Sequence, residues 1–229
     1  MEKKKKTAVS FAKNFLDNDR YWMQYKRADL KAPFTKRVLQ FKIELPEILP
    51  LIWRRILVPS NYNFWDLHIA IQDSMGWLDT KEHCFEITSG KKMSRLGVSD
   101  FDEEGRHIVF PGWEIPLLCY FDDLGVTAKY LYDFKDSWWH SVQLEGYIFK
   151  DKSIKYPVCI GGERACPLED CGGTQGYYEV LRILSDPQNE NHYKLKSWIG
   201  KEWDSEKFDL HDIKIGDSLR RWKKQFMED

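Results

Sequence analysis

Three cysteines in a glycine-rich stretch are the first side chains in this sequence whose types and spacing suggest chemistry. Cys159, Cys166 and Cys171 fall within thirteen residues, and five of the chain's 14 glycines lie between positions 159 and 176. Thiolates spaced along such a loop can converge on one tetrahedral zinc ion, because glycine lets the backbone turn tightly around the metal. We expect His140 as the fourth ligand, with three alternatives: His83, His68 and Asp170. Two other interpretations remain open, namely three reduced structural thiols, or a redox pair between Cys166 and Cys171.

Three histidines are predicted to point inward. His68 falls on the apolar stripe of an expected helix, His83 shares a strand face with Phe85, and His140 shares one with Trp138. An unpaired imidazole is costly to bury, so a histidine satisfied within the core is the plainer interpretation of each. Because all three face inward, a common pocket lined by them is the sharper alternative.

Arg54 is predicted to lie on the apolar face of a strand, in phase with Ile52 and Ile56. A buried guanidinium needs compensation, and the expected hairpin offers Asp133 or Asp136 as a carboxylate partner. We therefore expect an Arg54–carboxylate pair that fixes the hairpin against the sheet. The alternative is a bulge in the strand that returns Arg54 to water.

The aromatic content of 15% with ten tryptophans is typical of a well-packed core. A base-stacking platform is the alternative use for an aromatic such as Trp138.

Two acidic side chains of the cysteine loop complete the set of residues that we expect to line a pocket beside the hairpin. The set comprises Arg54, His68, His83, Asp133, Asp136, Trp138, His140, Glu169 and Asp170.

The elements that position these side chains follow from the periodicity of apolar residues. Alternation over residues 39–45 and 52–58 predicts two antiparallel strands, and residues 83–88 a third. Asn63 begins a helix that runs to Met75 and ends at Gly76. Residues 128–134 and 138–148 alternate on either side of a short turn, which predicts a hairpin. Helices are expected near residues 175–185, 191–199 and 209–226, and a polar loop over residues 89–107.

This order of elements predicts an α+β fold, with a mostly antiparallel sheet and packed helices. A β-grasp-like core fits the same order. The fold is expected to occupy a single domain, residues 38–229, preceded by a basic helical arm, residues 1–37.

The charge of the chain is divided unevenly between the arm and the body. Residues 1–38 hold 11 basic and 4 acidic side chains, a net charge of +7, so the remaining residues carry −8 of the total of −1. A basic arm can bind nucleic acid, although a solvated leader helix is the plainer interpretation. The absence of a long apolar run, a signal peptide and a glycosylation sequon leads us to expect a cytoplasmic protein with no membrane partner.

Several standard signatures are missing from the sequence. It has no Walker A loop, no glycine fingerprint of a dinucleotide-binding fold, no His-Glu-x-x-His and no Gly-x-Ser-x-Gly. The readily recognised nucleotide-binding, zincin and hydrolase classes are therefore excluded.

Six short motifs, in the same order, resemble the plasmid pRiA4b ORF-3-like family, from about Val38 to Leu219. They are Trp53-Arg54-Arg55, Leu67-His68, Gly76-Trp77 followed by His83 and Phe85, Tyr132-Asp133-Phe134-Lys135-Asp136-Ser137-Trp138 with His140, Ala165-Cys166-Pro167-Leu168-Glu169-Asp170-Cys171-Gly172-Gly173 with Gly176-Tyr177, and Phe208-Asp209-Leu210. The sequence departs from the family pattern at Lys135, where glycine is usual, and at Leu168, where a second proline is common. The resemblance implies a compact α+β domain found on plasmids, mobile elements and chromosomes, and it implies no activity.

The leading functional expectation is a non-catalytic binding or interaction domain with a Cys/His-lined loop or pocket. One alternative is a metal-dependent hydrolase of nucleic acid or a phosphate ester, with Glu169 or Asp136 as general base at a zinc ion. The other is an accessory protein that binds nucleic acid through its basic arm.

Overall fold

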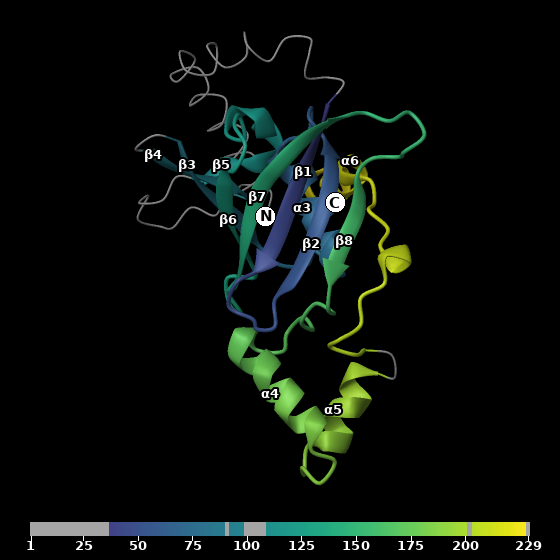
Figure 1. Ribbon diagram of the computed structural model, residues 1–229. Coiled ribbons are helices and arrows are strands. Elements are labelled where there is room, and N and C mark those ends of the chain that lie inside the picture. The colour runs from purple at the N-terminus through teal and green to yellow at the C-terminus, as the bar shows by residue number, and fades with distance from the viewer. Residues whose placement is uncertain (1–36, 90–91, 99–108, 201–202, 228–229) are drawn as a thin grey trace, which may run out of the picture.

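A single eight-stranded sheet organises the computed structural model, which describes residues 37–89, 92–98, 109–200 and 203–227 (Figure 1). The strands lie side by side in the order β5-β4-β3-β6-β7-β1-β2-β8. Their bounds are β1 Arg37–Leu45, β2 Ile52–Pro59, β3 His83–Ser89, β4 Lys92–Gly97, β5 Val109–Pro111, β6 Thr127–Tyr132, β7 Trp138–Phe149 and β8 Val158–Glu163. All neighbouring pairs are antiparallel except β4 and β5.

Four α-helices accompany the sheet within the described residues, so the predicted α+β class with a mostly antiparallel sheet is confirmed. They are α3 Phe64–Met75, α4 Gly173–Ser185, α5 His192–Ile199 and α6 Ser218–Phe226. Where the chain is described, three short 3-10 turns join other elements: η2 Gly112–Glu114, η3 Leu117–Cys119 and η4 Leu210–Asp212. The helices α4 and α5 project from one end of the sheet (Figure 1). No helix in the described part of the chain has the length and apolar character needed to cross a membrane.

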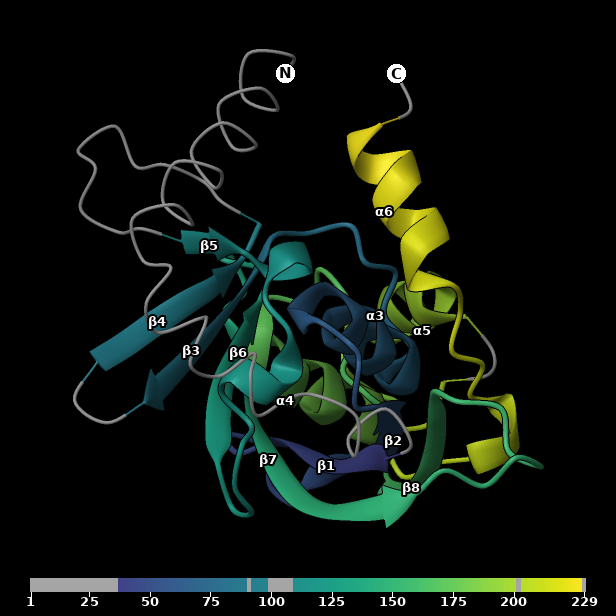
Figure 2. The ribbon, with the colours of Figure 1, turned by 90° about the horizontal axis from the view of Figure 1, so that it is seen from above.

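Local sequence signals set the bounds of α3, the helix that the sheet curves around (Figure 2). The Asn63 side chain accepts from the backbone N–H of Asp66, and the Asp66 carboxylate accepts from the N–H of Asn63, which forms a capping box. At the other end Gly76 adopts a left-handed conformation with φ of 90°, as the sequence predicted. The buried side of α3 packs in a core of aromatic rings, where Phe64 meets Phe85 edge to face and stacks on Phe121.

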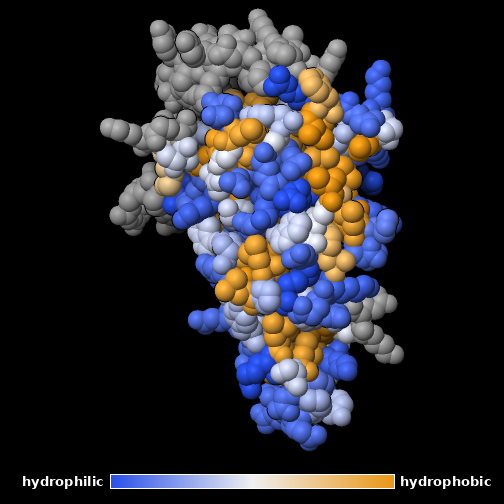
Figure 3. All heavy atoms as spheres, in the orientation of Figure 1, coloured by the Kyte–Doolittle hydropathy of each residue, from blue (hydrophilic) through white to orange (hydrophobic). Residues whose placement is uncertain are grey.

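The sequence underestimated the extent of the sheet. Part of the expected polar loop of residues 89–107 forms β4, in which the side chains of Ser94 and Leu96 alternate inward and are buried. Residues 90–91 and 99–108 lie outside the described residues. Residues 158–163, expected in a turn-rich loop, form the edge strand β8. The β-grasp-like core stays a prediction. The observed sheet has eight strands, more than the five that the sequence predicted. Apolar side chains are exposed at the end of β7, in the connection that follows it and on β8, at Phe149, Ile154 and Ile160 respectively. Apolar surface is visible over this side of the molecule (Figure 3).

The C-terminal segment is fastened across α3. Only the final part of the expected helix of residues 209–226 is helical, because α6 begins at Ser218. The Ser218 hydroxyl donates to Asp66, and the Ser218 carbonyl accepts from the indole N–H of Trp65. Arg221 forms an ion pair with Asp73 and lies 3.7 Å from the carboxylate of Asp79. The predicted arm, residues 1–37, lies outside the described residues except for Arg37, which begins β1.

Candidate binding pocket

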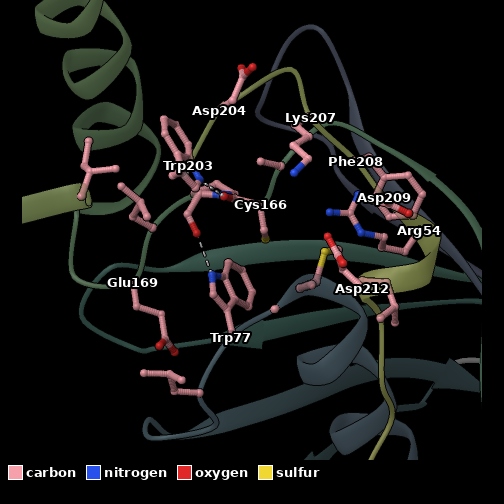
Figure 4. Close-up of a pocket in the computed structure, with 18 of the residues that line it drawn as sticks. Arg54, Trp77, Cys166, Glu169, Trp203, Asp204, Lys207, Phe208, Asp209 and Asp212 are labelled. Atoms are coloured by element: carbon pink, nitrogen blue, oxygen red, sulfur yellow. Dashed lines mark hydrogen bonds between the residues drawn. The ribbon is translucent and has the colours of Figure 1, made fainter. Parts of the chain in front are cut away.

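A pocket of about 860 Å³ lies where three segments of the chain meet beside the β2–β8 edge of the sheet (Figure 4). The first segment is the turn after α3, residues 75–80, and the second is the cysteine loop, residues 165–170. The third comes from the C-terminal part of the chain. Its lining residues are Trp198, Ile199, Trp203, Asp204, Lys207, Phe208, Asp209, Asp212 and Ile213.

Two indole groups hold the backbone of the cysteine loop. Trp77 donates from Nε1 to the carbonyl oxygen of Pro167 at 2.9 Å, and Trp203 donates to the carbonyl oxygen of Cys166 at 3.1 Å. Trp77 is itself stacked on Tyr132, with ring centroids 5.0 Å apart. Because these bonds join all three wall segments, the shape of the pocket is set within the folded chain.

Arg54 forms the floor of the pocket and is 2% exposed, so its predicted inward orientation is confirmed. The expected carboxylate partner is wrong, because the guanidinium donates to four backbone carbonyls instead. These belong to Ser74 at 2.8 Å, Trp53 at 2.8 Å, Glu163 at 2.9 Å and Arg164 at 2.8 Å. The Ser74 carbonyl belongs to the last turn of α3, where the helix dipole favours a cation. Arg54 thereby ties the end of α3 to β2 and to the chain leaving β8.

The walls carry five carboxylates, from Glu169, Asp170, Asp204, Asp209 and Asp212. Glu169 accepts from the hydroxyl of Tyr132 at 2.6 Å, and burial together with this bond raises the pKa of Tyr132. Asp170 is paired with Lys81 at 2.7 Å. Asp204 and Asp209 each accept from a backbone N–H two residues later. The Asp212 carboxylate has no hydrogen-bond or ion-pair partner in the part of the chain that is described.

The three clustered cysteines are packing residues in this structure. Cys159 and Cys166 are buried in the hydrophobic core, Cys171 packs against it, and all three are free thiols. Burial raises the pKa of Cys159 and Cys166, and it raises the pKa of Cys171 to about 12. Neutral thiols at pH 7 are poor nucleophiles and poor metal ligands. Cys166 and Cys171, the pair expected by the redox interpretation, form no disulfide bond in this structure.

No group of three or more His, Cys, Asp or Glu side chains in the described ranges is arranged to hold a metal ion. His140, the expected fourth ligand, directs Nδ1 to the carbonyl oxygens of Trp138 and Tyr130, at 3.0 and 3.2 Å. Its Nε2 is buried without a hydrogen-bond partner, and burial lowers the pKa of the ring to about 4. The zinc site therefore stays a prediction for which the structure supplies no ligand set.

The three inward histidines gather around Tyr130 rather than around the pocket. The ring centroids of His68, His83 and His140 lie 5.9, 6.1 and 5.1 Å from that of Tyr130. His68 contacts Tyr130 Oη through Nδ1 at 2.7 Å and Asp79 through Nε2 at 2.6 Å. Because the Asp79 carboxylate accepts, Nε2 of His68 carries the proton and Nδ1 accepts from the tyrosine. His68 is thus a satisfied core residue, His83 stacks on it with ring centroids 3.5 Å apart, and Nε2 of His140 is left without a partner.

The remaining predicted site residues support the hairpin and the loop. Asp133 accepts from the backbone N–H groups of Lys135 and Asp136, which closes the turn between β6 and β7. Asp136 accepts from the N–H of Gly172 at 3.0 Å and so links this turn to the start of α4. Trp138 is 1% exposed and packs near Trp77, which favours the core interpretation. Four predicted residues meet at the pocket: Arg54, Cys166, Glu169 and Asp170.

The sequence did not identify the C-terminal wall, residues 198–199 and 203–213, as part of a site. The signal that was present is the motif Phe208-Asp209-Leu210, which follows Trp203 and Asp204 in a segment without helical or strand periodicity. Phe208 packs over the guanidinium of Arg54, 4.4 Å from the ring centroid. The distance of more than 150 residues between these two positions hides the contact from local pattern analysis.

Comparison with known proteins places this fold and these motifs in a group without an assigned activity. The plasmid pRiA4b ORF-3-like protein family matches residues 37–212. Uncharacterized protein y4hQ of Sinorhizobium fredii (strain NBRC 101917 / NGR234) is 31% identical over 192 residues, which cover 82% of this chain and 95% of that protein. MM3350, a protein of unknown function from Methanosarcina mazei Go1 with a crystal structure, has a sequence 35% identical to this one. It superimposes with a TM-score of 0.70 and covers 78% of this chain and 98% of that one.

Proposed function

Because the chain belongs to the plasmid pRiA4b ORF-3-like family, whose two relatives above have no stated activity, we propose a function from its own geometry. The protein is a non-catalytic binding domain, and its ligand or a side chain of its partner enters the pocket around Cys166. The observation that carries this proposal is the pocket itself, with a preformed loop between two tryptophan donors.

The size and composition of the pocket suit a ligand. Its volume of about 860 Å³ falls in the range of roughly 300–1,000 Å³ typical of small-molecule sites. Trp77, Trp203 and Phe208 offer apolar surface, and a few carboxylates offer directional contacts. A loop that is already held in place lowers the entropy lost on binding, since fewer groups have to be ordered.

The side chains around the pocket support binding better than catalysis. The nearest sulfur nucleophile, Cys166, is a buried thiol whose pKa is raised, and the structure pairs it with no general base. The histidines lie around Tyr130, and burial lowers the pKa of His68 and His83 well below the usual value. A hydrolase would require either an activated nucleophile or a metal-bound water.

Three probes with one ring and different charges test the proposal: benzamidine, benzamide and benzoate. We expect at least one of them to shift the indole N–H resonance of Trp203 in the full chain, as measured by NMR. Leu168→Trp, which places a larger side chain in the pocket wall, should abolish that shift. Leu124→Trp is the matched control, because Leu124 is 54% exposed and lies outside the pocket. If no probe perturbs any indole resonance of the pocket, the proposal is overturned.

A further inference from the structure

We propose that the ligand of this pocket carries a positive charge, as a guanidinium or ammonium group on an apolar stem. This inference rests on the proposed function and names the class of ligand. Three features of the pocket carry it: the balance of charge, the aromatic walls and the placement of the carboxylates, of which Asp212 has no partner among the described residues.

The charge balance of the lining residues favours a cation. Five carboxylates face two cations, Arg54 and Lys207. Arg54 does not offset the carboxylates well, because it is bonded to four carbonyls and covered by Phe208. Lys81 lies outside the pocket lining and pairs with Asp170. The remaining four carboxylates then face one lining cation that is not already bonded to carbonyls, Lys207, so the net charge around the pocket is negative.

The aromatic walls suit a cation joined to an apolar group. Within the pocket, the Arg54 guanidinium already stacks on the ring of Phe208. The chain itself therefore makes one cation–aromatic contact of the kind proposed for the ligand. Trp203 turns its N–H to the Cys166 carbonyl, and no ring among the described residues stacks on its face. Tryptophan binds cations more strongly than the other aromatic side chains do. A ligand cation can therefore stack on Trp203 as Arg54 stacks on Phe208.

Two of these carboxylates, Asp212 and Glu169, lie on different sides of the pocket. Asp212 lies beside Arg54, and Glu169 lies toward the other end, near Trp77 (Figure 4). One Glu169 oxygen accepts from Tyr132, whereas the described residues offer no partner to Asp212. Carboxylates hydrogen-bond a guanidinium or an ammonium group directly, which adds to the stacking contact.

An anionic ligand is the main competing class. It would gain Lys207 and the one N–H of Arg54 that is not bonded to a carbonyl. It would also have to approach the four carboxylates that Lys81 does not pair with, so the repulsive contacts outnumber the attractive ones. A neutral ligand would use the aromatic walls and leave the carboxylates without a role.

Titrations of the full chain with benzamidine, benzamide and benzoate separate these classes, with the Trp203 indole resonance as readout. We expect benzamidine to bind at least about tenfold more tightly than benzamide, and benzoate to bind more weakly than either. Added salt should weaken benzamidine binding and leave benzamide binding unchanged. Equal or tighter binding of benzamide or benzoate overturns the cation inference, and it leaves the pocket as a binding site.

Substitution of single carboxylates locates the effect. Asp212→Asn should weaken benzamidine binding by roughly three- to tenfold, because one attractive charge is removed while the shape is kept. Glu190→Gln removes the same charge from the exposed turn before α5 and should leave binding unchanged. Identical affinities for the Asp212→Asn and parent proteins would contradict the role of that carboxylate.

Two guanidinium compounds then distinguish the source of the cation. Acetyl-arginine methylamide presents the group as a peptide side chain does, and agmatine presents it on a free small molecule that also carries a primary amine. Tighter binding of the arginine derivative would identify a protein partner with a basic side chain, and tighter binding of agmatine a free amine. Either result supports the cation class, and binding of neither would overturn it.

Discussion

The imidazole rings of His68 and His83 stack face to face, with centroids 3.5 Å apart and an interplanar angle of 7°. The two rings come from α3 and β3 and join a helix to the sheet. Two imidazolium ions could not be held so close in a buried site, so this contact requires that at most one ring is protonated. Burial accordingly lowers the pKa of both histidines well below its usual value, and the Arg221 charge acts in the same direction on His68.

We predict that the free energy of unfolding falls as the pH is lowered from 7 to 5.5. Below pH 6.5 the unfolded chain binds protons at His68, His83 and His140 that the folded protein excludes, so stability is lost in that window. Each histidine contributes about 1 kcal/mol to the loss. Asp79 partly offsets this loss of stability. Burial raises the pKa of its carboxyl group to about 6, so the folded state binds a proton there at a higher pH than the unfolded state does. The net loss expected from urea unfolding is about 2–3 kcal/mol.

Variants assign this pH dependence to the buried rings. His83→Phe keeps a ring against His68 and removes one titrating group, so the loss between pH 7 and 5.5 should shrink by about 1 kcal/mol. His211→Ala is the control, since His211 is exposed in the 3-10 turn η4. A stability that does not change between these pH values would show that the histidines take up protons in the folded protein.

Arg54→Met should destabilise the protein by about 3–5 kcal/mol, because four backbone carbonyls lose their donor at once. Arg55→Met is a matched control one residue away on the same strand. Arg55 points to the other face, is part exposed, and pairs with Glu145, so its loss should cost no more than about 1 kcal/mol. Urea unfolding measures both, and equal losses would contradict the anchoring role of Arg54.

The sequence predicted those elements whose signals are local. Asn63 and Gly76 bound α3, and the alternation of residues 39–45 and 52–58 fixed which faces of β1 and β2 are buried. The inward direction of Arg54 followed from the same alternation. Its partners did not, because the carbonyls of Ser74, Glu163 and Arg164 carry no sequence signal and lie 20 to 110 residues away.

The candidate site was predicted only in part for a related reason. The cysteine loop and Glu169 were identified from residue types close together in sequence, and they do line the pocket. The wall from Trp203 to Ile213 packs against them through tertiary contacts alone. Tyr130, which joins the three histidines, was overlooked because a buried tyrosine is typical of any core strand.

Gly176→Ala should disturb the cysteine loop, although the residue is in the first turn of α4. A Cβ atom at this position would lie 1.7 Å from the carbonyl oxygen of Cys171, so the loop or the helix would have to move. We expect a loss of at least about 2 kcal/mol in urea unfolding and a shifted Trp203 indole resonance. Gly146→Ala in β7 is the control, since nothing lies within 4 Å of its Cβ position. A Gly176→Ala protein as stable as the control would contradict this contact.

The thiols of Cys166 and Cys171 should react with iodoacetamide on the order of a thousandfold more slowly in the native protein than in urea at pH 8. Burial raises the pKa of both, and to about 12 for Cys171, so few thiolates are present in the fold. Mass spectrometry of time points measures the rates, and Cys171, which is partly exposed, should be modified before Cys166. Fast native alkylation of Cys166 would show an activated thiolate.

Since bound zinc would also protect these thiols, the same protein, purified without chelators, is assayed for metal. About one equivalent of zinc that is lost in Cys166→Ser would assign the protection to a metal site instead of burial.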